Sequence, residues 1–296
     1  MQFGVTVPNV HETLAEPRTM TAVARHAEEV GFASVWVNDH VVLPPVPSAG
    51  EAAFAARYGE QHGQSLFEPL ITLAYLAAAT ERIMLGTSVY LLPLRHPVLA
   101  AKQVVSLDVL SGGRAIFGVG VGWLEAEFEA VDVPFKRRGA RTDEALRMLK
   151  ALCDDADSEF LPKPVQRPHP PIWVGGRSEA AMRRAARLGD AWHPSHLTCD
   201  ELRRFIPELG VHCERAGRAP ADVAVTTRRR LVRSGAAAEA EEDRVLQGGP
   251  DRIAATVAEL EEVGLSHLIV EIPGASEPAL LENLDWFGRE VLARDG

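Results

Sequence analysis

Short apolar segments alternate with longer amphipathic segments along the whole chain. Eight of the short segments are rich in apolar or β-branched residues and end at Gly, Pro or polar residues, as β-strands do. These predicted strands are Gln2–Pro8, Ser34–Val37, Arg82–Val89, Arg114–Gly120, Pro171–Val174, Asp190–His193, Val223–Val232 and His267–Ile272. A helical segment follows each strand, so the pattern predicts an α/β fold with a parallel sheet. Eight such units are the number that closes a (β/α)8 TIM barrel.

The predicted helices have recognisable ends. Thr19 is expected to cap a helix that runs to Val30, and Gly31 is expected to end it in a left-handed conformation. A similar joint of helix, glycine and strand recurs at Gly189 and Gly264, as expected of a barrel built from like units. The other helices are predicted at Pro69–Thr80, Pro97–Leu110, Ala140–Leu152, Ser178–Leu188, Asp200–Arg215, Pro250–Val263 and Pro278–Leu292.

Two segments interrupt the alternation. Val41–Phe67 has no periodicity and is too long for an ordinary connection between a strand and a helix, and long loops at the catalytic end of a barrel are often lids or substrate walls. Gly235–Gly248 is rich in Ala and Glu and is predicted to be an exposed extra helix. The predicted fold is therefore a barrel with insertions at the C-terminal ends of its strands.

Length and composition agree with a barrel of one domain. The chain has 296 residues, of which 46% are hydrophobic, and it is predicted to be a single domain, 1–296. It begins directly with a predicted strand and contains no apolar run near the roughly 20 residues of a membrane span, so we expect a soluble, cytoplasmic protein with no membrane partner.

Charge and cysteine content exclude other classes of protein. The net charge of -10 disfavours binding to nucleic acid, and the densest basic run, Arg228–Arg230, is expected to be solvated or salt-bridged. Cys153, Cys199 and Cys213 are scattered and do not have the spacing of metal ligands. We therefore predict no metal site and expect the cysteines to be reduced and structural.

Unusual polar residues follow the second predicted strand, where the active site of a barrel lies. Asn38, Asp39 and His40 stand together at that point. A histidine has an ordinary pKa of about 6.5, so it can donate a proton to a substrate or accept one near neutral pH. The alternative is a histidine that only satisfies hydrogen bonds at the strand end. We predict Asp39 and His40 as catalytic residues, with His193, at another strand end, in reserve.

Glycines and small polar residues follow the third and fourth strands. In the run Gly86–Tyr90 they either let a flat ligand approach the backbone or allow a bulge. The run Gly118–Trp123 does not match the dinucleotide fingerprint, because the spacing and the later acidic residue are missing. Its glycines are predicted to thin the barrel mouth so that a ring system can lie across it.

The segment after the fifth strand has the composition of an anion site. Gly175, Gly176, Arg177 and Ser178 combine flexible glycines, a guanidinium, a hydroxyl and the start of a helix, which together suit a phosphate. A plain N-cap explains Ser178 equally well.

Four longer motifs together resemble the luciferase-like monooxygenase superfamily, and within it the oxidoreductases that use the deazaflavin coenzyme F420. They are VWVNDHVVLP at 35–44, LGTSVYLLPLRHPVLAAKQVVSLDVLSGGR at 85–114, FGVGVGWLEAEFEAVDVPFKRRGARTDEAL at 117–146 and PKPVQRPHPPIWVGGRSEAAMRRAARLGDAW at 162–192. The resemblance implies a (β/α)8 barrel with long insertions that holds the cofactor ring across its mouth. Homodimers are frequent among similar proteins.

The resemblance also implies roles for particular residues. It places Asp39 near the polar edge of the ring, His40 toward the substrate, and a non-proline cis peptide bond at or beside Ser88–Val89. It places the cofactor phosphate at Gly175–Ser178. With the residues singled out above, the predicted cofactor-binding set is Asp39, Thr87, Ser88, Val89, Gly120, Gly122, Gly175, Gly176, Arg177 and Ser178.

Two departures from the family pattern bear on the reaction. Family members that oxidise alcohols or sugars have a glutamate after the glycine run, whereas this chain has Trp123, with Glu125 two residues on. The stretch Asp154–Leu161 is shorter than the insertion that relatives have there. We therefore expect a reductase that passes hydride from reduced F420 to a small organic acceptor. The alternatives are an FMN-dependent monooxygenase that uses oxygen and, third, a flavin-binding protein without turnover.

Overall fold

The structure is a computed structural model of the chain, and it describes residues 1–11, 13–42, 65–154, 159–233 and 243–294. Within these residues, eight parallel strands close into a barrel in which each strand pairs with its neighbour in the chain and β12 pairs with β1. The strands are β1 Gln2–Thr6, β3 Ser34–Val37, β5 Met84–Thr87, β7 Ala115–Gly120, β8 Ile172–Gly175, β9 Ala191–His193, β10 Ala224–Val232 and β12 His267–Glu271. The predicted (β/α)8 barrel is confirmed, and all eight strands lie within or next to the predicted ranges.

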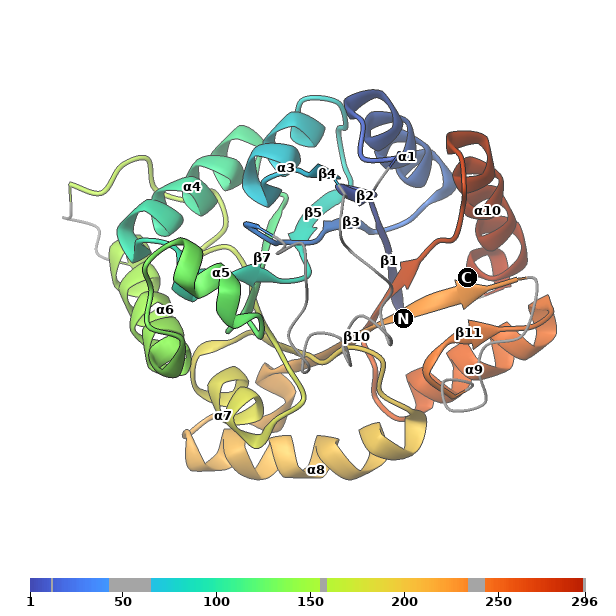
Figure 1. Cartoon of the computed structure of the whole chain (residues 1–296). Helices are drawn as coiled ribbons and strands as arrows, with labels where there is room; N and C mark the ends of the chain where they lie inside the picture. The colour runs from blue at the N-terminus through green and yellow to red at the C-terminus, as the bar shows by residue number, and fades with distance from the viewer. Residues whose placement is uncertain (12, 43–64, 155–158, 234–242, 295–296) are drawn as a thin grey trace.

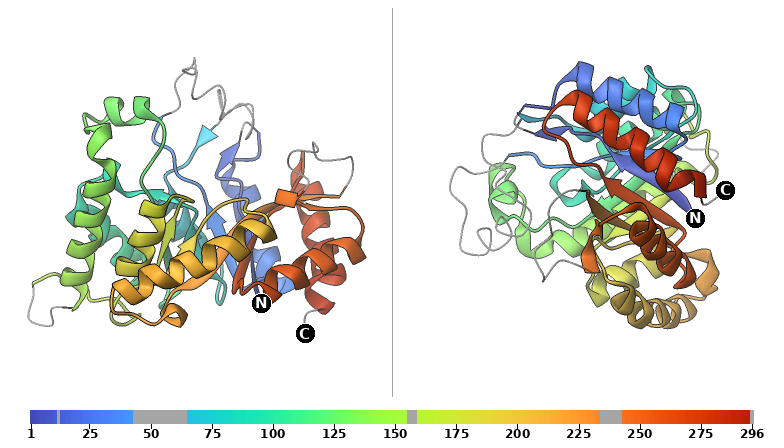
Figure 2. Two further views of the ribbon diagram at one scale, coloured as in Figure 1. Left: turned by 90° about the horizontal axis from the view of Figure 1, so that it is seen from below. Right: turned by 90° about the vertical axis from the view of Figure 1, so that its right-hand side faces the viewer.

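Helices surround the barrel (Figure 1). They are α1 Pro17–Val30, α3 Pro69–Ala77, α4 Pro97–Leu110, α6 Arg138–Asp154, α7 Glu179–Leu188, α8 Cys199–Arg215, α9 Pro250–Glu262 and α10 Glu277–Glu290, with the short α5 Glu125–Ala130 and the 3₁₀ turns η1 Leu92–Leu94, η2 Phe135–Arg137, η3 Pro220–Asp222 and η5 Leu292–Arg294. Their apolar faces pack on the outward side chains of the strands, such as Val35, Leu85 and Leu268, in one buried layer. The two ends of the chain lie at the same end of the molecule (Figure 2) because α10 returns the chain from the end of β12 to the level at which β1 begins.

The predicted start of the first helix is wrong. α1 begins at Pro17, with Glu16 at the N-cap position, because proline at the first helical position needs no hydrogen-bond acceptor for its nitrogen. Thr19 lies inside the first turn, where its hydroxyl donates to Glu277 of α10 at 2.8 Å. The end is as predicted, with Gly31 in the left-handed region at φ 103°.

The two segments that interrupt the predicted alternation of strands and helices lie largely outside the described residues. Of Val41–Phe67, only the ends are described, and Ser65–Leu66 (β4) pairs antiparallel with Val10–His11 (β2). The N-terminal part of Gly235–Gly248, where an extra helix was expected, also falls outside. At its other end the helix prediction is wrong, because Leu246–Gln247 (β11) is a buried strand that pairs with β10.

Aromatic side chains fill the interior of the barrel below the C-terminal ends of its strands. Trp36 of β3 is fully buried and stacks against Trp173 of β8, with ring centroids 4.6 Å apart. A Cβ atom at Gly4 or at Gly86 would lie 2.4 or 2.3 Å from the Trp36 ring, so neither position has room for a side chain. Gly86 therefore makes space for the protein's own tryptophan rather than for a flat ligand.

Among the described residues, none of the helices has the combination of length and apolar character that a membrane span needs. Cys153, Cys199 and Cys213 are buried free thiols. Burial raises the pKa of Cys153 to about 11, which keeps its thiol protonated and unreactive.

Candidate active site

A cavity of about 500 Å³ opens at the C-terminal ends of the barrel strands. Among the residues predicted for the site, Asp39, His40, Ser88, Val89, Gly176 and Arg177 line this cavity. Its other described lining residues are Val10, Asn38, Leu91, Trp123, Ser195, His196, Arg228 and Glu271. The volume is within the range of small-molecule and cofactor sites.

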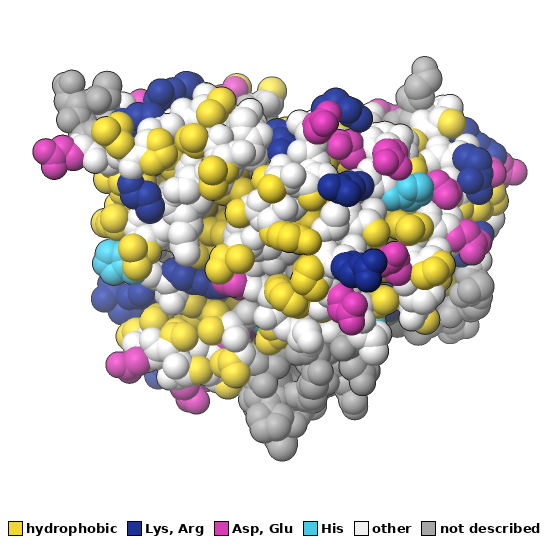
Figure 3. All heavy atoms as spheres, turned by 90° about the horizontal axis from the view of Figure 1, so that it is seen from above, with side chains coloured by type: hydrophobic (Ala, Val, Ile, Leu, Met, Phe, Trp, Pro, Cys, Tyr) yellow, Lys and Arg dark blue, Asp and Glu magenta, His cyan; other side chains and the backbone are white. Residues whose placement is uncertain are grey.

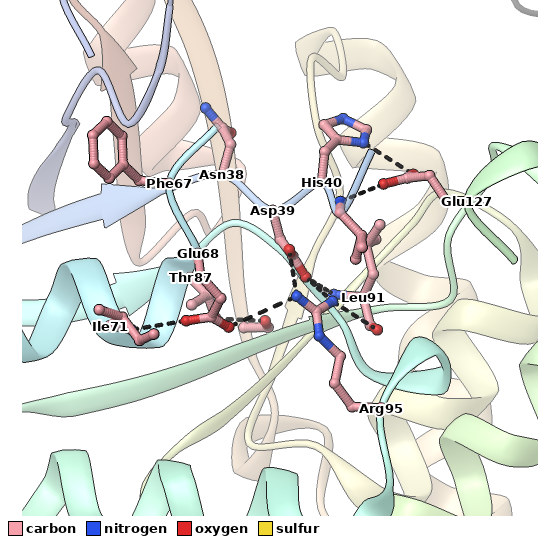
Figure 4. A network of polar contacts seen from close by, with 12 residues as sticks. Asn38, Asp39, His40, Phe67, Glu68, Ile71, Thr87, Leu91, Arg95 and Glu127 are labelled. Atoms are coloured by element: carbon pink, nitrogen blue, oxygen red, sulfur yellow. Dashed lines mark hydrogen bonds and ion pairs between the residues drawn. The ribbon is translucent and has the colours of Figure 1, made fainter. Parts of the chain in front are cut away.

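His40 is held by a carboxylate that the sequence analysis missed. Its Nδ1 lies 3.0 Å from Oε2 of Glu127, and Oε1 of the same carboxylate accepts from the backbone N–H of Val41 at 2.6 Å (Figure 4). The indole of Trp123 stands edge-on to the imidazole, at 6.2 Å between ring centroids. Within the described residues, no donor or acceptor contacts Nε2 of His40. This nitrogen is therefore available to a ligand in the cavity.

The carboxylate of Asp39 is already hydrogen-bonded by other residues of the protein. Its two carboxylate oxygens form a bidentate pair with the guanidinium of Arg95 at 2.5 and 2.8 Å, and Oδ2 also accepts from the N–H of Leu91 at 2.7 Å. Arg95 lies over the ring of Tyr90 and pairs with Glu68 at 3.7 Å (Figure 4). Burial raises the pKa of Glu68 above its ordinary value. Asp39 thus ties the end of β3 to the segment after β5, and its role in catalysis stays a prediction.

The peptide bond between Ser88 and Val89 is cis, as predicted. Ser88 lies at the end of β5, where its hydroxyl contacts Nε2 of His193 at 2.9 Å. Thr87 does not line the cavity, because it is fully buried and donates to the carbonyl of Gly118 at 2.7 Å. The end of β5 is therefore fastened on both sides, to β7 and to β9.

His193 does not have a free nitrogen. Its Nδ1 lies 2.7 Å from the hydroxyl of Thr226, and Nε2 contacts Ser88. Burial, with the neighbouring charge of Arg228, lowers the pKa of His193 to about 3, so the ring is neutral near pH 7. This histidine is a structural member of the barrel interior rather than a second candidate acid.

The glycines at the ends of β7 and β8 pack closely against the protein's own chain, and the prediction that those of the run Gly118–Trp123 thin the mouth for a ring stays a prediction. A Cβ atom at Gly120 would lie 2.4 Å from the Val89 side chain, and one at Gly175 would lie 2.9 Å from it. At Gly118 the collision would be with the carbonyl oxygen of Thr87. These glycines make room for the end of β5. Gly122 adopts φ 77° beside Phe128, so the conformation and packing of the protein chain also explain this glycine.

The segment after β8 divides into a cavity side and a helix side. Gly176, with φ 111°, and the exposed Arg177 line the cavity. Ser178 is the N-cap of α7 and accepts from the N–H of Ala181 at 3.3 Å, which is the alternative considered from the sequence. Gly176 and Arg177 are therefore the members of the predicted anion site that line the cavity.

A charged pair at the cavity floor was also missed. Nε of Arg228 donates to Glu271 at 2.5 Å, and Nη1 donates to Oδ1 of Asn38 at 2.8 Å and to the carbonyl of Ser88 at 2.9 Å. Burial raises the pKa of Glu271, but the charge of Arg228 and the hydrogen bond to His196 outweigh burial, so the pKa lies well below its ordinary value.

The arginine run in β10 was expected to be solvated or salt-bridged. Arg228 is salt-bridged but faces the cavity, Arg229 is buried between the barrel and its helices, and Arg230 is exposed. The description as solvated is therefore wrong for Arg229, because alternate residues of a strand face opposite sides of the sheet.

A barrel with a polar cavity at the C-terminal ends of its strands is the architecture of a ligand-binding or enzymatic TIM barrel. Residues 1–262 match the family model of the luciferase-like monooxygenases, and the chain belongs to this family.

Three comparisons show the range of the relatives. The uncharacterized protein Rv0940c of Mycobacterium tuberculosis is 34% identical over 66% of this chain and 72% of its own length. An FMNH2-dependent dimethylsulfone monooxygenase of Pseudomonas putida is 30% identical over 74% of this chain and 62% of its own. The coenzyme F420-dependent tetrahydromethanopterin reductase of Methanopyrus kandleri has the same fold, with a TM-score of 0.77, 16% identity and 99% coverage of both chains. The family thus indicates an oxidoreductase, and the names of the relative and of the structural neighbour state dependence on FMNH2 in one case and on F420 in the other.

Proposed function

We propose that the protein is a reductase that binds reduced coenzyme F420 at the barrel mouth and transfers hydride to a small organic acceptor. The observation that supports this most directly is His40. Its Nε2, which no described residue contacts, faces a ring-sized cavity, while a buried carboxylate holds its other nitrogen. Such a histidine can hydrogen-bond to an acceptor or protonate it as the acceptor is reduced.

The residues around the cavity fit a flat anionic cofactor. The backbone at Ser88 and Val89 and the side chain of Trp123 offer surfaces against which a ring can lie. Gly176 and Arg177 would hold a phosphate, because a positive-φ glycine lets the backbone approach an anion and a guanidinium pairs with it. The reduced cofactor, when bound, would supply the hydride.

The direction of reaction is inferred from Trp123. In relatives that oxidise alcohols or sugars a glutamate follows the glycine run, and here an indole occupies that position beside His40. The other acidic candidate, Glu125, is exposed at the start of α5 and does not line the cavity. An indole in place of that glutamate favours reduction with His40 as donor.

A second candidate is an FMN-dependent monooxygenase. It is favoured by the 30% identity to the dimethylsulfone monooxygenase, whose name states FMNH2 dependence. A flavin-binding protein without turnover ranks third, because Asp39 and His40 are both present at the site.

Titration of the cofactor-free protein with F420 and with FMN, each followed by fluorescence, distinguishes the candidates. We expect F420 to bind at least tenfold more tightly, a difference of about 1.4 kcal/mol. Tight binding of FMN alone would refute the first proposal in favour of the second. Binding of either cofactor without hydride transfer to a panel of small carbonyl and activated-alkene acceptors would favour the third.

We also propose that the protein is cytoplasmic and forms a homodimer through the outer faces of α3 and α4. α3 contains no charged residue, and Ile71, Leu99 and Leu110 are 68%, 63% and 73% exposed. Figure 3 shows apolar side chains gathered over these helices, whereas charged side chains are more frequent beside them. An uncharged apolar patch can pair with its own copy across a two-fold axis. Light scattering should give the mass of a dimer, and Ile71→Glu with Leu99→Glu should give a monomer.

A further inference from the structure

Glu127 is the only carboxylate among the described residues that contacts the imidazole of His40. We propose that Glu127 is a positioning residue that fixes the proton of neutral His40 on Nδ1 and balances the charge of the ring when Nε2 is protonated as well. This inference rests on the proposed function only in assigning His40 to the acceptor. The placement of the proton can be measured without cofactor.

With Glu127 ionised, the hydrogen bonds allow one arrangement of protons. An ionised carboxylate only accepts hydrogen bonds, so the nitrogen 3.0 Å from Oε2 must be the donor. The other oxygen, Oε1, is already used by the N–H of Val41. Neutral His40 therefore has its proton on Nδ1 and an unprotonated Nε2 at the cavity. When Nε2 also takes a proton, the positive ring faces a carboxylate 3.0 Å away.

Glu127 is rigidly held. Its side chain is 0% exposed. The next residue, Phe128, is fully buried in a cluster with Leu91 and Leu94, and its ring packs against Phe135. A buried carboxylate is costly unless it is paired, and within the described residues His40 and Val41 are the partners of the Glu127 side chain. Glu127 and His40 thus satisfy each other across 87 residues of sequence.

The pair of His40 and Glu127 can donate the proton on Nε2 to an acceptor, and the charge of the doubly protonated ring is balanced by the carboxylate beforehand. The reduced cofactor, when bound, would supply a hydride to the acceptor, and the electron pair of the acceptor's reduced bond would move to the atom that takes the proton from Nε2 of His40. His40 then returns to the neutral form with Nδ1–H still on Glu127. The proton on Nε2 is replaced from solvent before the next turnover.

The variant Glu127→Gln should reverse the arrangement. Its amide has one oxygen, and the N–H of Val41 needs an acceptor. The amide NH2 would then face Nδ1 of His40, which must accept, so that neutral His40 takes its proton on Nε2. Glu125→Gln is the matched control, because Glu125 lies in the same helix and is exposed.

The test is nitrogen NMR on cofactor-free protein labelled in its histidines, with the His40 signals identified by their loss in His40→Gln. Wild type and Glu125→Gln should show the proton on Nδ1 above the titration of the ring, and Glu127→Gln should show it on Nε2. A wild-type proton on Nε2, or no change in Glu127→Gln, would overturn the proposal even if activity is lost. The wild-type measurement decides the matter should the variant fail to fold.

Turnover gives the second measurement. With a competent acceptor, Glu127→Gln should lose at least about tenfold in kcat while its cofactor Kd stays within a few-fold. Unchanged kcat with an altered tautomer would overturn the positioning role. If His40→Ala keeps full turnover while the NMR result is as expected, the proposed function fails and the placement of the proton by Glu127 stands.

Discussion

His40 and His193 both stand at the ends of barrel strands, yet the structure uses them in opposite ways. His193 lies in the barrel interior, where Ser88 and Thr226 occupy both nitrogens and burial lowers its pKa to about 3. His40 lies at the mouth, where Glu127 occupies one nitrogen and the other faces the cavity. Position at a strand end therefore indicates only the region of the active site. Which of the two histidines can react with a ligand depends on whether its ring has a nitrogen that the protein does not already hydrogen-bond.

The largest expected effect lies at the mouth. His40→Ala should lower kcat for a competent acceptor by at least about a hundredfold, because a positioned general acid contributes about 10²–10⁴-fold. Cofactor affinity, measured by fluorescence titration, should stay within a few-fold. Near-normal turnover, or affinity that falls in step with rate, would mean that His40 only completes hydrogen bonds at the strand end.

The interior histidine should affect stability first. His193→Ala removes the short contacts of the buried hydroxyls of Ser88 and Thr226 and leaves them only contacts at 3.4 Å, to Arg228 and to the Trp192 carbonyl. A buried polar group that loses its partner costs about 1–3 kcal/mol. The free energy of unfolding in urea should therefore fall by about 2 kcal/mol or more, whereas His40→Ala should change it by less. Equal losses of stability in the two variants would remove the distinction between mouth and interior.

The phosphate loop tests the mouth at a second point. Gly176→Asp should weaken cofactor binding at least tenfold, about 1.4 kcal/mol, through repulsion of the anion and loss of backbone approach. Because Gly176 has φ 111°, the variant should also lose stability. Gly31→Asp, at φ 103° with open space around it, is the control for that strain and should leave affinity unchanged. Unchanged affinity in Gly176→Asp would place the phosphate elsewhere.

The smallest effect is a difference in pH dependence. The pKa of His193 is about 3 when folded and about 6.5 when unfolded, so its contribution to stability is present above pH 6.5 and is lost as pH falls toward 3. His193→Gln should make the free energy of unfolding less dependent on pH, by on the order of 1 kcal/mol between pH 6 and 5. His267, with a pKa lowered by burial to about 4, adds a slope of the same sign in both proteins. Parallel curves for wild type and variant would show that the pKa of His193 is the same in the folded and unfolded states.

The sequence predicted the barrel because its eight strands and their helices follow one repeated local pattern, and that pattern also placed His40 and Gly176 at the mouth. It could not tell what occupies the space beside a glycine. At Gly86 and Gly120 the neighbour is Trp36 or Val89, contributed by another strand, and no local signal distinguishes such a neighbour from a ligand.

Long-range pairing also limited the prediction of the site. Glu125 and Glu127 are two residues apart in one acidic helix, and only packing decides which of them is buried against His40. The sequence does contain a signal that Glu127 is buried. Leu124 and Phe128 are four residues apart, so they lie on the inner face of the helix, and Glu127 lies beside them. Arg228 was missed because successive side chains of a strand point to opposite faces of the sheet, and the sequence does not indicate which face lines a cavity.

The aromatic filling beneath the cavity has a consequence for the order of events in a catalytic cycle. Trp36, Trp173 and His267 lie against one another across the lower barrel, so the cavity has its floor at the level of Ser88 and Arg228. Two ligands that share this cavity must then arrive and depart through the same opening. Whichever of them rests against the floor has to enter first and leave last, so steady-state kinetics should show an ordered mechanism rather than a random one.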